Sequence, residues 1–338
     1  MNLAEGISIV IPTKNRIDCL VSLLESIDMA KGFVKEPIIT ETIVVSDGSD
    51  VHISDQLSKL LDQFQVNYQI LKENKGPSYA RNHGASLAQY NSLLFLDDDL
   101  TIQEDYFQVL QDLDLNEKIV GIEGVTKVEK NTSGLSTSAS TDDFCGGFGS
   151  GNILYQKDVF LRLGGFDEHY FYSPLGIHFR EDTDLGLHAL ALGQILLNKA
   201  LVAFHPVHEG FDPWFIIKDA RKYFFEAYFK RKNPMAKKYI GGWVQKGVLK
   251  TRQTRELVSL MICLSMLGLL FQEPIFGVIF LLGYLLLAVL ILRKFSPKVQ
   301  DLHYYLINIV LYPLVHQGFY IFGKVYFLNK RDRKREAF

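Results

Sequence analysis

Three consecutive aspartates, Asp97, Asp98 and Asp99, follow directly after the apolar run at 92–96. Adjacent carboxylates at the end of a buried strand repel one another, so their ionised forms are costly unless a cation neutralises them. Carboxylate oxygens are hard ligands that suit Mg²⁺ or Mn²⁺, and these ions often bind a substrate phosphate at the same time. The triplet therefore predicts a divalent metal ion that holds a phosphorylated substrate.

A further aspartate, Asp47, ends a second β-branched run at 42–46 and precedes Gly48, which permits a tight turn. In open α/β sheets, ligands bind outside the carboxyl ends of the strands. Because Asp47 and the aspartate triplet both lie at such ends, we expect them to share one crevice. An aspartate before glycine is also common in turns that bind nothing, and this interpretation of Asp47 stays open.

A third acidic group, Glu181, Asp182 and Asp184, precedes an apolar run that begins at Leu185. Acidic residues are common in the first turn of a helix because they interact favourably with the helix dipole. That explanation suits Asp184 and Glu181 better than Asp182. A carboxylate close to a reacting hydroxyl can take its proton, so we predict Asp182 as a general base, with Glu181 orienting it or replacing it.

The elements that must position these groups alternate along the first part of the chain. Short β-branched or apolar runs predict strands, longer segments with helical spacing predict helices, and the alternation indicates an α/β fold. The predicted strands are residues 7–11, 42–46, 68–71, 92–96, 119–125 and 200–204. The predicted helices are residues 20–27 and 77–89, and the polar stretch at 130–141 is a predicted loop.

The composition fits a reduced, intracellular setting. The chain has 338 residues, 48% of them hydrophobic, which is enough for one large domain or two smaller ones. Cys19, Cys145 and Cys263 are widely spaced and form no C-x-x-C pair, so neither a zinc site nor a disulfide framework is indicated. Residues 1–6 lack the basic region of a signal peptide and residues 7–11 are too short for its apolar region, so we expect a catalytic part that is not exported.

Six motifs, in order along the chain, resemble those of glycosyltransferase family 2. They lie at residues 8–16, 44–49, 74–84, 95–99, 163–168 and 180–185, and the similarity covers about residues 6–210. The resemblance implies the GT-A fold, an α/β architecture with a Rossmann-like mixed sheet flanked by helices. It also implies a nucleotide-sugar donor, a divalent metal (Mn²⁺ or Mg²⁺) and inversion at the anomeric carbon.

The resemblance also implies roles for individual residues in the metal and base sites. Asp99 matches the metal ligand, Asp97 would share the metal or hold the ribose, and His208 would complete the metal site. Asp98 is expected either behind the metal ligands or in solvent. Asp182 matches the position of the family's base.

The donor-binding positions implied by the resemblance gather around the ends of the first, second and fourth strands. Asp47 matches the position that contacts the nucleobase, and Arg81 would bring positive charge near the base and phosphates. A solvated helix residue is an equally good interpretation of Arg81, and a simple bulge is one of the glycine-rich stretch at 148–152. The full set is Pro12, Asn15, Arg16, Asp47, Lys75, Gly76, Arg81, Asp97, Asp98, Gly151 and Asn152.

The last third of the chain has a different character. We expect a catalytic domain at 1–215, a basic amphipathic juxtamembrane region at 216–255, a transmembrane hairpin at 256–293, and an interfacial or third membrane helix with a basic tail at 294–338. A pair of buried core helices is the alternative to the hairpin. Cations flank both ends of the hairpin, which places them in the cytoplasm by the positive-inside tendency. We therefore expect the inner (plasma) membrane, with the catalytic domain facing the cytoplasm.

The segment at 218–255 mixes basic and aromatic residues. Such a patch fits nucleic acid or anionic lipid headgroups. Its place just before the apolar segments favours membrane lipids and argues against nucleic acid.

These observations predict a membrane-anchored, metal-dependent, inverting glycosyltransferase of the hexosyltransferase type. Its donor would be a nucleoside diphosphate sugar, a UDP-sugar first, and its acceptor a glycan or polyprenyl-linked hydroxyl of an envelope polysaccharide or exopolysaccharide. Processive polysaccharide synthases of the family carry a Gln-x-x-Arg-Trp motif, which this sequence lacks, so transfer of one sugar is favoured. The sugar, the acceptor, the linkage and the oligomeric state stay open.

Two other functions stay open as well. A sugar-nucleotide nucleotidyltransferase shares an α/β fold and acidic metal ligands, but it usually has a glycine-rich basic loop near its N-terminus, and residues 12–16 are not one. A non-catalytic membrane scaffold that keeps the fold is disfavoured by the intact aspartates Asp47, Asp97, Asp99 and Asp182.

Overall fold

The computed structural model describes residues 3–50, 59–128 except 60, 63 and 65, 147–206, 212–236 except 213, 244–269 except 246, 247 and 250, 274–295, 301–328 and 330. The chain forms two compact units. Their described parts are residues 3–128 with 147–206, here the sheet unit, and the residues between 212 and 330, here the helical unit. The predicted loop at 130–141 and the predicted metal ligand His208 lie outside the described residues.

A mixed sheet of eight strands forms the centre of the sheet unit, in the order β3-β2-β1-β4-β7-β6-β10-β5. β1 to β4 are parallel, β7 is antiparallel to β4 and β6, and β5 is antiparallel to β10. Because β10 is parallel to β6, its carboxyl end reaches the same edge as that of β4. The strands are β1 Ile7–Thr13, β2 Thr40–Asp47, β3 Asn67–Leu71, β4 Ser92–Leu96, β5 Thr101–Ile102, β6 Ile119–Val128, β7 Asn152–Gln156 and β10 Gln194–His205.

Alternate side chains of the central strands enter two separate apolar layers. Ile9 of β1 and Leu94 of β4 belong to one layer, whereas the neighbouring Val10 and Phe95 belong to the other. Successive strand residues point to opposite faces of a sheet, so a strand covered on both sides needs an uninterrupted apolar run. This requirement explains the continuous runs in the sequence.

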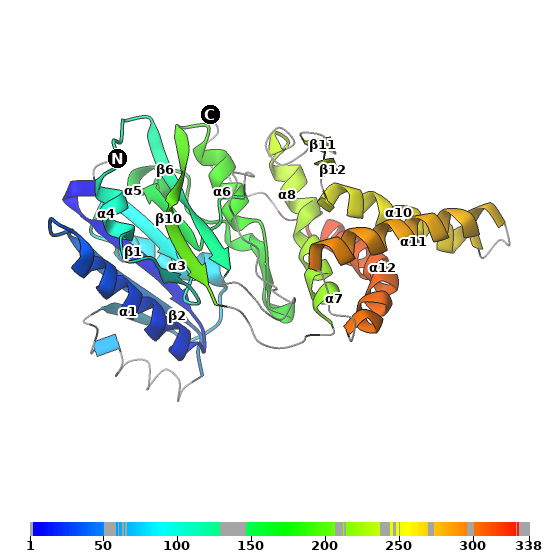
Figure 1. Cartoon of the computed structure of the whole chain (residues 1–338), viewed down its shortest axis with the longest axis horizontal. Helices are drawn as coiled ribbons and strands as arrows, with labels where there is room; N and C mark the ends of the chain where they lie inside the picture. Colours follow the sequence, from blue (N-terminus) through cyan, green and yellow to red (C-terminus); the bar gives the residue numbers. More distant parts are fainter. Residues whose placement is uncertain are drawn as a thin grey trace. The chain divides into compact units, whose positions relative to one another are not determined.

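Helices cover both faces of the sheet. α1 (Ile17–Phe33) and α4 (Tyr106–Gln111) pack on one layer, and α3 (Pro77–Leu87), α5 (Lys157–Arg162) and α6 (Glu181–Ala189) pack on the other (Figure 1). A small hairpin, β8 (Phe171–Tyr172) with β9 (Ile177–His178), precedes α6. The predicted α/β fold with a mixed sheet flanked by helices is therefore confirmed.

The ends of several elements differ from the prediction. β1 continues through Pro12 to Thr13, α1 extends the helix predicted at 20–27 in both directions, and β10 begins well before residue 200. The sequence pattern does not reveal β7, because its few apolar residues follow a glycine-rich stretch and lead directly into α5.

The helical unit is built on apolar helices. It contains α7 (Phe215–Ala220), α8 (Glu226–Lys232), the hairpin β11 (Val244–Gln245) with β12 (Val248–Leu249), α10 (Thr251–Leu269), α11 (Pro274–Phe295) and α12 (Leu302–Tyr326). α10 and α11 lie side by side (Figure 1). Ile216, Val258, Leu287 and Ile309 are among the buried residues of its core.

Among the described residues, α12 is the one helix long and apolar enough to cross a membrane, judged by length and composition. The apolar parts of the predicted hairpin, Leu257–Leu269 and Pro274–Leu290, are shorter. The longest apolar helix thus lies in the segment predicted as interfacial or third. Many large apolar side chains of these helices, including Leu264, Leu282 and Val325, are exposed.

Candidate active site

The carboxyl edge of the sheet brings together side chains from three parallel strands. Arg16 follows β1, Asp47 ends β2, and Asp97 to Asp99 follow β4. His205 ends β10, which reaches the same edge. The predicted sharing of one edge by Asp47 and the aspartate triplet agrees with this topology.

Asp99 is held as an anion by two basic partners. The guanidinium of Arg16 forms a short ion pair with Asp99 Oδ2, and His205 Nε2 lies 3.5 Å from the same oxygen. Burial alone would raise the pKa of Asp99, but the hydrogen bond with His205 and the charge of Arg16 outweigh it and lower the pKa to about 2. Asp99 is therefore charged at any physiological pH.

Asp98 lies deeper in the protein than Asp99, on the inner side of Arg16. Its side chain is buried, accepts a hydrogen bond of 2.6 Å from Thr13 Oγ1, and lies 2.9 Å from the guanidinium of Arg16. Burial raises the pKa of Asp98 to about 6 against the opposing charge of Arg16. Of its two predicted positions, the one in solvent is wrong; Asp98 anchors Arg16 from behind.

Asp97 is the most accessible of the three aspartates, with 37% of its side chain exposed. Its Oδ1 accepts a hydrogen bond of 2.5 Å from Arg81 Nη2. A Cβ at Gly151 would lie 2.7 Å from Asp97 Oδ2, so only glycine leaves the carboxylate its place. Gly151, predicted as a donor contact, therefore lies directly beside Asp97.

The side chains of Asp97, Asp99 and His205 suit a divalent metal that also binds a phosphate. Within the described residues, no three His, Cys, Asp or Glu side chains form a ready-made metal cage. Mg²⁺ in phosphate sites is commonly held by one or two carboxylates, with substrate phosphates and water as its other ligands. Asp99 and the half-exposed Asp97 fit that pattern, with His205 as an imidazole donor beside Asp99. Arg16, itself half-exposed, supplies the neutralising charge in their present arrangement.

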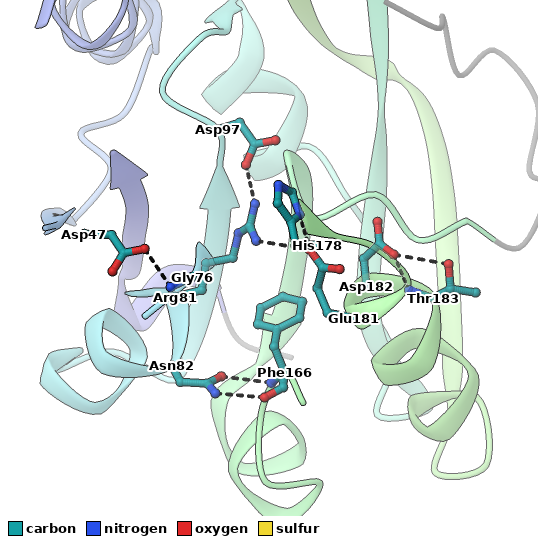
Figure 2. A network of polar contacts seen from close by, with 10 residues as sticks. All are labelled: Asp47, Gly76, Arg81, Asn82, Asp97, Phe166, His178, Glu181, Asp182 and Thr183. Carbon is teal, nitrogen blue, oxygen red and sulfur yellow. Dashed lines mark hydrogen bonds and ion pairs between the residues drawn. The ribbon is translucent and has the colours of Figure 1, made fainter. Parts of the chain in front are cut away.

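Asp47 holds the loop before α3. Its Oδ1 accepts a hydrogen bond of 2.7 Å from the Lys75 amide. Its Oδ2 accepts one of 2.8 Å from the Gly76 amide, which Figure 2 shows. Burial raises the pKa of Asp47 against these two bonds. Gly76 has φ +91° and the ring of Phe171 fills the space where a Cβ would be, so this turn requires glycine. The predicted group of Asp47, Lys75 and Gly76 therefore forms one structure.

Two predicted donor-binding residues have mainly structural contacts. Pro12 is buried within β1. Asn15, at φ +56°, donates its amide to Ser49 Oγ and accepts the Asp50 amide through Oδ1 at 2.9 Å. Asn15 thereby ties the turn after β1 to the turn after β2.

Asn152, a predicted donor contact, makes core hydrogen bonds in the structure. Its side chain is buried, accepts a hydrogen bond of 2.6 Å from Tyr106 Oη, and donates to the carbonyl groups of Val125 and Leu201 at 3.2 Å each. Asn152 opens β7 directly after Gly151, and alternation along a strand sends the two positions to opposite sides. Asn152 is therefore a cross-link in the core, and Gly151 alone lies beside Asp97.

The predicted general base Asp182 and its neighbour Glu181 lie at the start of α6. Glu181 is buried, and its Oε1 lies 3.1 Å from His178 Nδ1 and 3.9 Å from Arg81 Nη1 (Figure 2). Burial would raise the pKa of Glu181, but the hydrogen bond from His178 and the charges of His178 and Arg81 lower it. Glu181 is thus the charged, enclosed member of the pair.

Asp182 is the more accessible member. Its Oδ1 accepts hydrogen bonds from the amide and hydroxyl of Thr183, at 2.6 and 3.1 Å. Burial and the neighbouring charge of Glu181 raise the pKa of Asp182 to about 7. A carboxylate with this pKa can both take and release a proton near neutral pH.

Arg81 is buried, so its interpretation as a solvated helix residue is wrong. Its side chain lies between Asp97 and Glu181 (Figure 2). The next residue, Asn82, donates to the Phe166 carbonyl at 2.8 Å and accepts the Phe166 amide at 2.8 Å. The motif at 163–168 therefore serves to fix α3, and with it Arg81, against the segment that leads to α6.

Sequence reasoning missed His205 and His178. His205 follows the predicted strand at 200–204, and its place at a parallel strand end could have signalled the contact with Asp99. His178 lies three residues before Glu181, outside any helix, and only the β8–β9 hairpin brings its ring to the carboxylate.

Comparison with known proteins agrees with this architecture. Residues 8–160 match the family described as Glycosyl transferase family 2. The mannosyltransferase PcManGT from Pyrobaculum calidifontis, solved with GDP-Man and Mn²⁺, superimposes with a TM-score of 0.52 at 12% identity, covering 96% of this chain and 88% of that one. At that identity the likeness concerns the fold.

Two curated relatives match the N-terminal part. A glucosyl-dolichyl phosphate glucuronosyltransferase from Haloferax volcanii is 27% identical over 168 residues, 43% of this chain and 51% of that protein. A poly-beta-1,6-N-acetyl-D-glucosamine synthase from Staphylococcus epidermidis is 27% identical over 134 residues, 38% of this chain and 30% of that protein. The chain thus spans about half or less of the length of these relatives. The GT-A type sheet and the match at 8–160, which contains the first four of the six motifs, make the sheet unit similar to glycosyl transferase family 2.

Proposed function

We propose that the protein is an inverting glycosyltransferase that moves one sugar from a nucleoside diphosphate donor to an acceptor hydroxyl. One observation carries the proposal: two carboxylates of the same unit have their pKa values pushed apart, Asp99 to about 2 and Asp182 to about 7. Such a difference is typical of a site in which one carboxylate stays charged and another moves a proton. The nucleotide-sugar ligand of the similarly folded mannosyltransferase supports the donor class.

In the proposed reaction, Asp182 accepts the proton of the acceptor hydroxyl while the oxygen attacks the anomeric carbon. The bond between that carbon and the diphosphate oxygen breaks, and the nucleoside diphosphate leaves on the opposite side, which inverts the configuration. Asp182 then returns the proton to solvent. This step needs the ionised form of Asp182, since the protonated form cannot accept a proton.

On the donor side, Asp47 with the Lys75–Gly76 turn would receive the nucleobase, and Asp97 the ribose or metal. Asp99, Asp97 and His205 would hold Mn²⁺ or Mg²⁺, which would supply positive charge to the leaving diphosphate. Arg16 is already paired with Asp98 and Asp99, and its exposed side chain is free to shift toward a phosphate. A UDP-sugar is our first choice of donor.

The acceptor we propose is a polyprenyl-linked or envelope glycan. The names of the two relatives, a dolichyl phosphate glucuronosyltransferase and a polysaccharide synthase, support this class. Addition of a single sugar follows from the missing Gln-x-x-Arg-Trp motif. The polyprenyl chain of such an acceptor is apolar, as are many exposed side chains of the helical unit.

We further propose that residues 216–338 attach the enzyme to the inner membrane, with residues 1–215 in the cytoplasm. Exposed large apolar side chains are numerous on α10, α11 and α12, and they support attachment, because large exposed apolar patches are rare on soluble monomers. The cationic side chains Lys230, Arg231 and Lys330 suit anionic headgroups. A reporter fused after Phe338 tests the topology: a cytoplasmic signal fits the hairpin with an interfacial α12, and the opposite signal means that α12 spans.

A nucleotide-release assay tests the proposed activity. Purified full-length protein in detergent is given a panel of nucleotide sugars with Mn²⁺, with and without a membrane lipid extract. We expect release of a nucleoside diphosphate that depends on one donor and increases with the extract. Asp99→Asn and Asp182→Asn should abolish it, whereas Asp114→Asn, an exposed aspartate away from the site, should not. A nucleotidyltransferase would instead need added pyrophosphate and would convert the nucleotide sugar into a nucleoside triphosphate and a sugar 1-phosphate. Formation of nucleoside triphosphate that depends on added pyrophosphate would therefore favour that alternative.

A further inference from the structure

A buried arginine joins the two halves of the site. The guanidinium of Arg81 comes from α3, and only 4% of its side chain is exposed. Its Nη2 donates to Asp97 Oδ1 at 2.5 Å, and its Nη1 lies 3.9 Å from Glu181 Oε1 (Figure 2). The metal-side carboxylate and the base-bearing helix α6 therefore meet on one side chain.

The positive charge of the buried Arg81 requires both of its carboxylate partners. An arginine keeps its proton in proteins, so a buried one needs anionic partners. Burial opposes the charged form of Arg81, but Asp97 and Glu181 outweigh it and raise its pKa. Removal of either carboxylate would leave a buried charge with half of its compensation.

The connection is also incompletely bonded. Within the described part of the chain, Arg81 Nε and Nη1 and Glu181 Oε2 are buried and have no hydrogen-bond partner. Buried polar atoms are normally paired, and a native exception calls for an explanation. Arg81 Nη1 lies 3.9 Å from Glu181 Oε1, beyond hydrogen-bond distance, so the two side chains have room to tighten as Asp97 takes up a ligand.

The surroundings fix Arg81 in place from below. The ring of Phe166 lies beneath the guanidinium, 5.5 Å from its carbon. Phe166 is held by both of its backbone hydrogen bonds to Asn82, the neighbour of Arg81 on α3. Arg81 is therefore held firmly on α3, so a displacement of α3 would be passed on through Arg81 to Glu181 at the start of α6.

Glu181 has the geometry of a support and not of a base. Only 4% of its side chain is exposed, and its Oε1 faces His178 and Arg81. Asp182, the neighbour, is partly exposed. The groups that face this pair are Arg81 from α3, His178 from β9, and Arg180 and Thr183 beside it.

We propose that Arg81 and Glu181 are positioning residues that tie Asp97, on the donor side, to the base Asp182. The pair sets the separation between the donor carboxylate and the base, and the charge of Glu181 sets the pH range in which Asp182 accepts a proton. This inference rests on the proposed function, since it assumes that Asp182 is the base.

A pH profile gives the first test. In Glu181→Gln, the negative charge beside Asp182 is gone, so the acidic limb of kcat/KM should move to lower pH than in wild type. A support that acted on packing alone would lower the rate without moving the limb. Glu117→Gln, an exposed glutamate of the same unit, is the matched control and should keep both rate and limb.

A double-mutant cycle gives the second test. Arg81→Met and Glu181→Gln should each lower kcat about tenfold or more, and the double variant should lose much less than the product of the two. Arg81→Lys keeps the charge and should recover part of the loss. Arg162→Met, an exposed arginine on α5, is the control.

The outcomes separate the two proposals. The positioning role of Arg81 and Glu181 would be refuted by two results together: independent effects of the two substitutions in the cycle, and an acidic limb of kcat/KM in Glu181→Gln at the same pH as in wild type. If Arg81→Met does not fold, the limb of Glu181→Gln decides alone. Absence of nucleotide release from wild type with every donor, or unchanged release in Asp182→Asn, would refute the proposed function instead.

Discussion

His205 Nε2 lies 3.5 Å from Asp99 Oδ2, although 106 positions along the chain separate the two residues. The hydrogen bond with Asp99 raises the pKa of His205, and the same contact helps to lower that of Asp99. The sheet creates this pair, because β10 and β4 end at one edge.

We therefore expect His205→Gln to weaken the use of metal. The concentration of Mn²⁺ that gives half-maximal nucleotide release should rise about tenfold, a usual effect of losing a group that orients or joins the ligands. His303→Gln, in the helical unit, is the control. If the Mn²⁺ dependence of His205→Gln equals that of wild type, His205 is not a metal ligand, and its contact with Asp99 stabilises only the metal-free protein.

The second prediction concerns pH. Asp182 must be ionised to accept a proton, and its pKa is raised to about 7. Below pH 7 the protonated form predominates, so kcat/KM should fall about tenfold for each pH unit as the pH decreases, and it should level off above pH 7. Initial rates between pH 5.5 and 8.5 at saturating Mn²⁺ measure this. A limb near pH 4, the range of an ordinary carboxylate, would remove Asp182 from the role of base.

The sequence predicts much of this arrangement and misses identifiable parts. β4 and the end of β2 are evident because an apolar run stops at carboxylates. The core contacts of Asn152 could not be predicted, because a sequence match cannot tell which of the two neighbours Gly151 and Asn152 faces the core. The burial of Arg81 could not be predicted either, because it depends on Asp97 and Glu181, which only the folded chain brings to it.

A third prediction tests the assignment of Gly151. A methyl group at this position would meet Asp97 Oδ2, so Gly151→Ala should displace the carboxylate and lower kcat/KM by about tenfold or more. Gly149→Ala is a close control, because nothing lies within 4 Å of the Cβ that it would add. Steady-state rates of both variants decide the matter, and equal rates would place Asp97 elsewhere during the reaction.

The fourth prediction separates stability from activity at Asn152. Asn152→Ala removes three buried hydrogen bonds, including the acceptor for Tyr106 Oη, and should cost about 3 kcal/mol. The melting temperature of the sheet unit, followed by circular dichroism, should fall by about 2–4 °C per kcal/mol. Asn91→Ala, at an exposed position, should melt as wild type does. A variant that melts normally but has lost donor affinity would return Asn152 to the binding site.

The stereochemistry of transfer is the sharpest test of Asp182 as the base of a single displacement. The donor that gives nucleotide release is supplied with Mn²⁺ and acceptor extract, and the anomeric configuration of the product is read by proton NMR. We expect a single added sugar with configuration opposite to that of the donor, and no product from Asp182→Asn. A product of retained configuration, or product formed equally well by Asp182→Asn, would contradict this expectation.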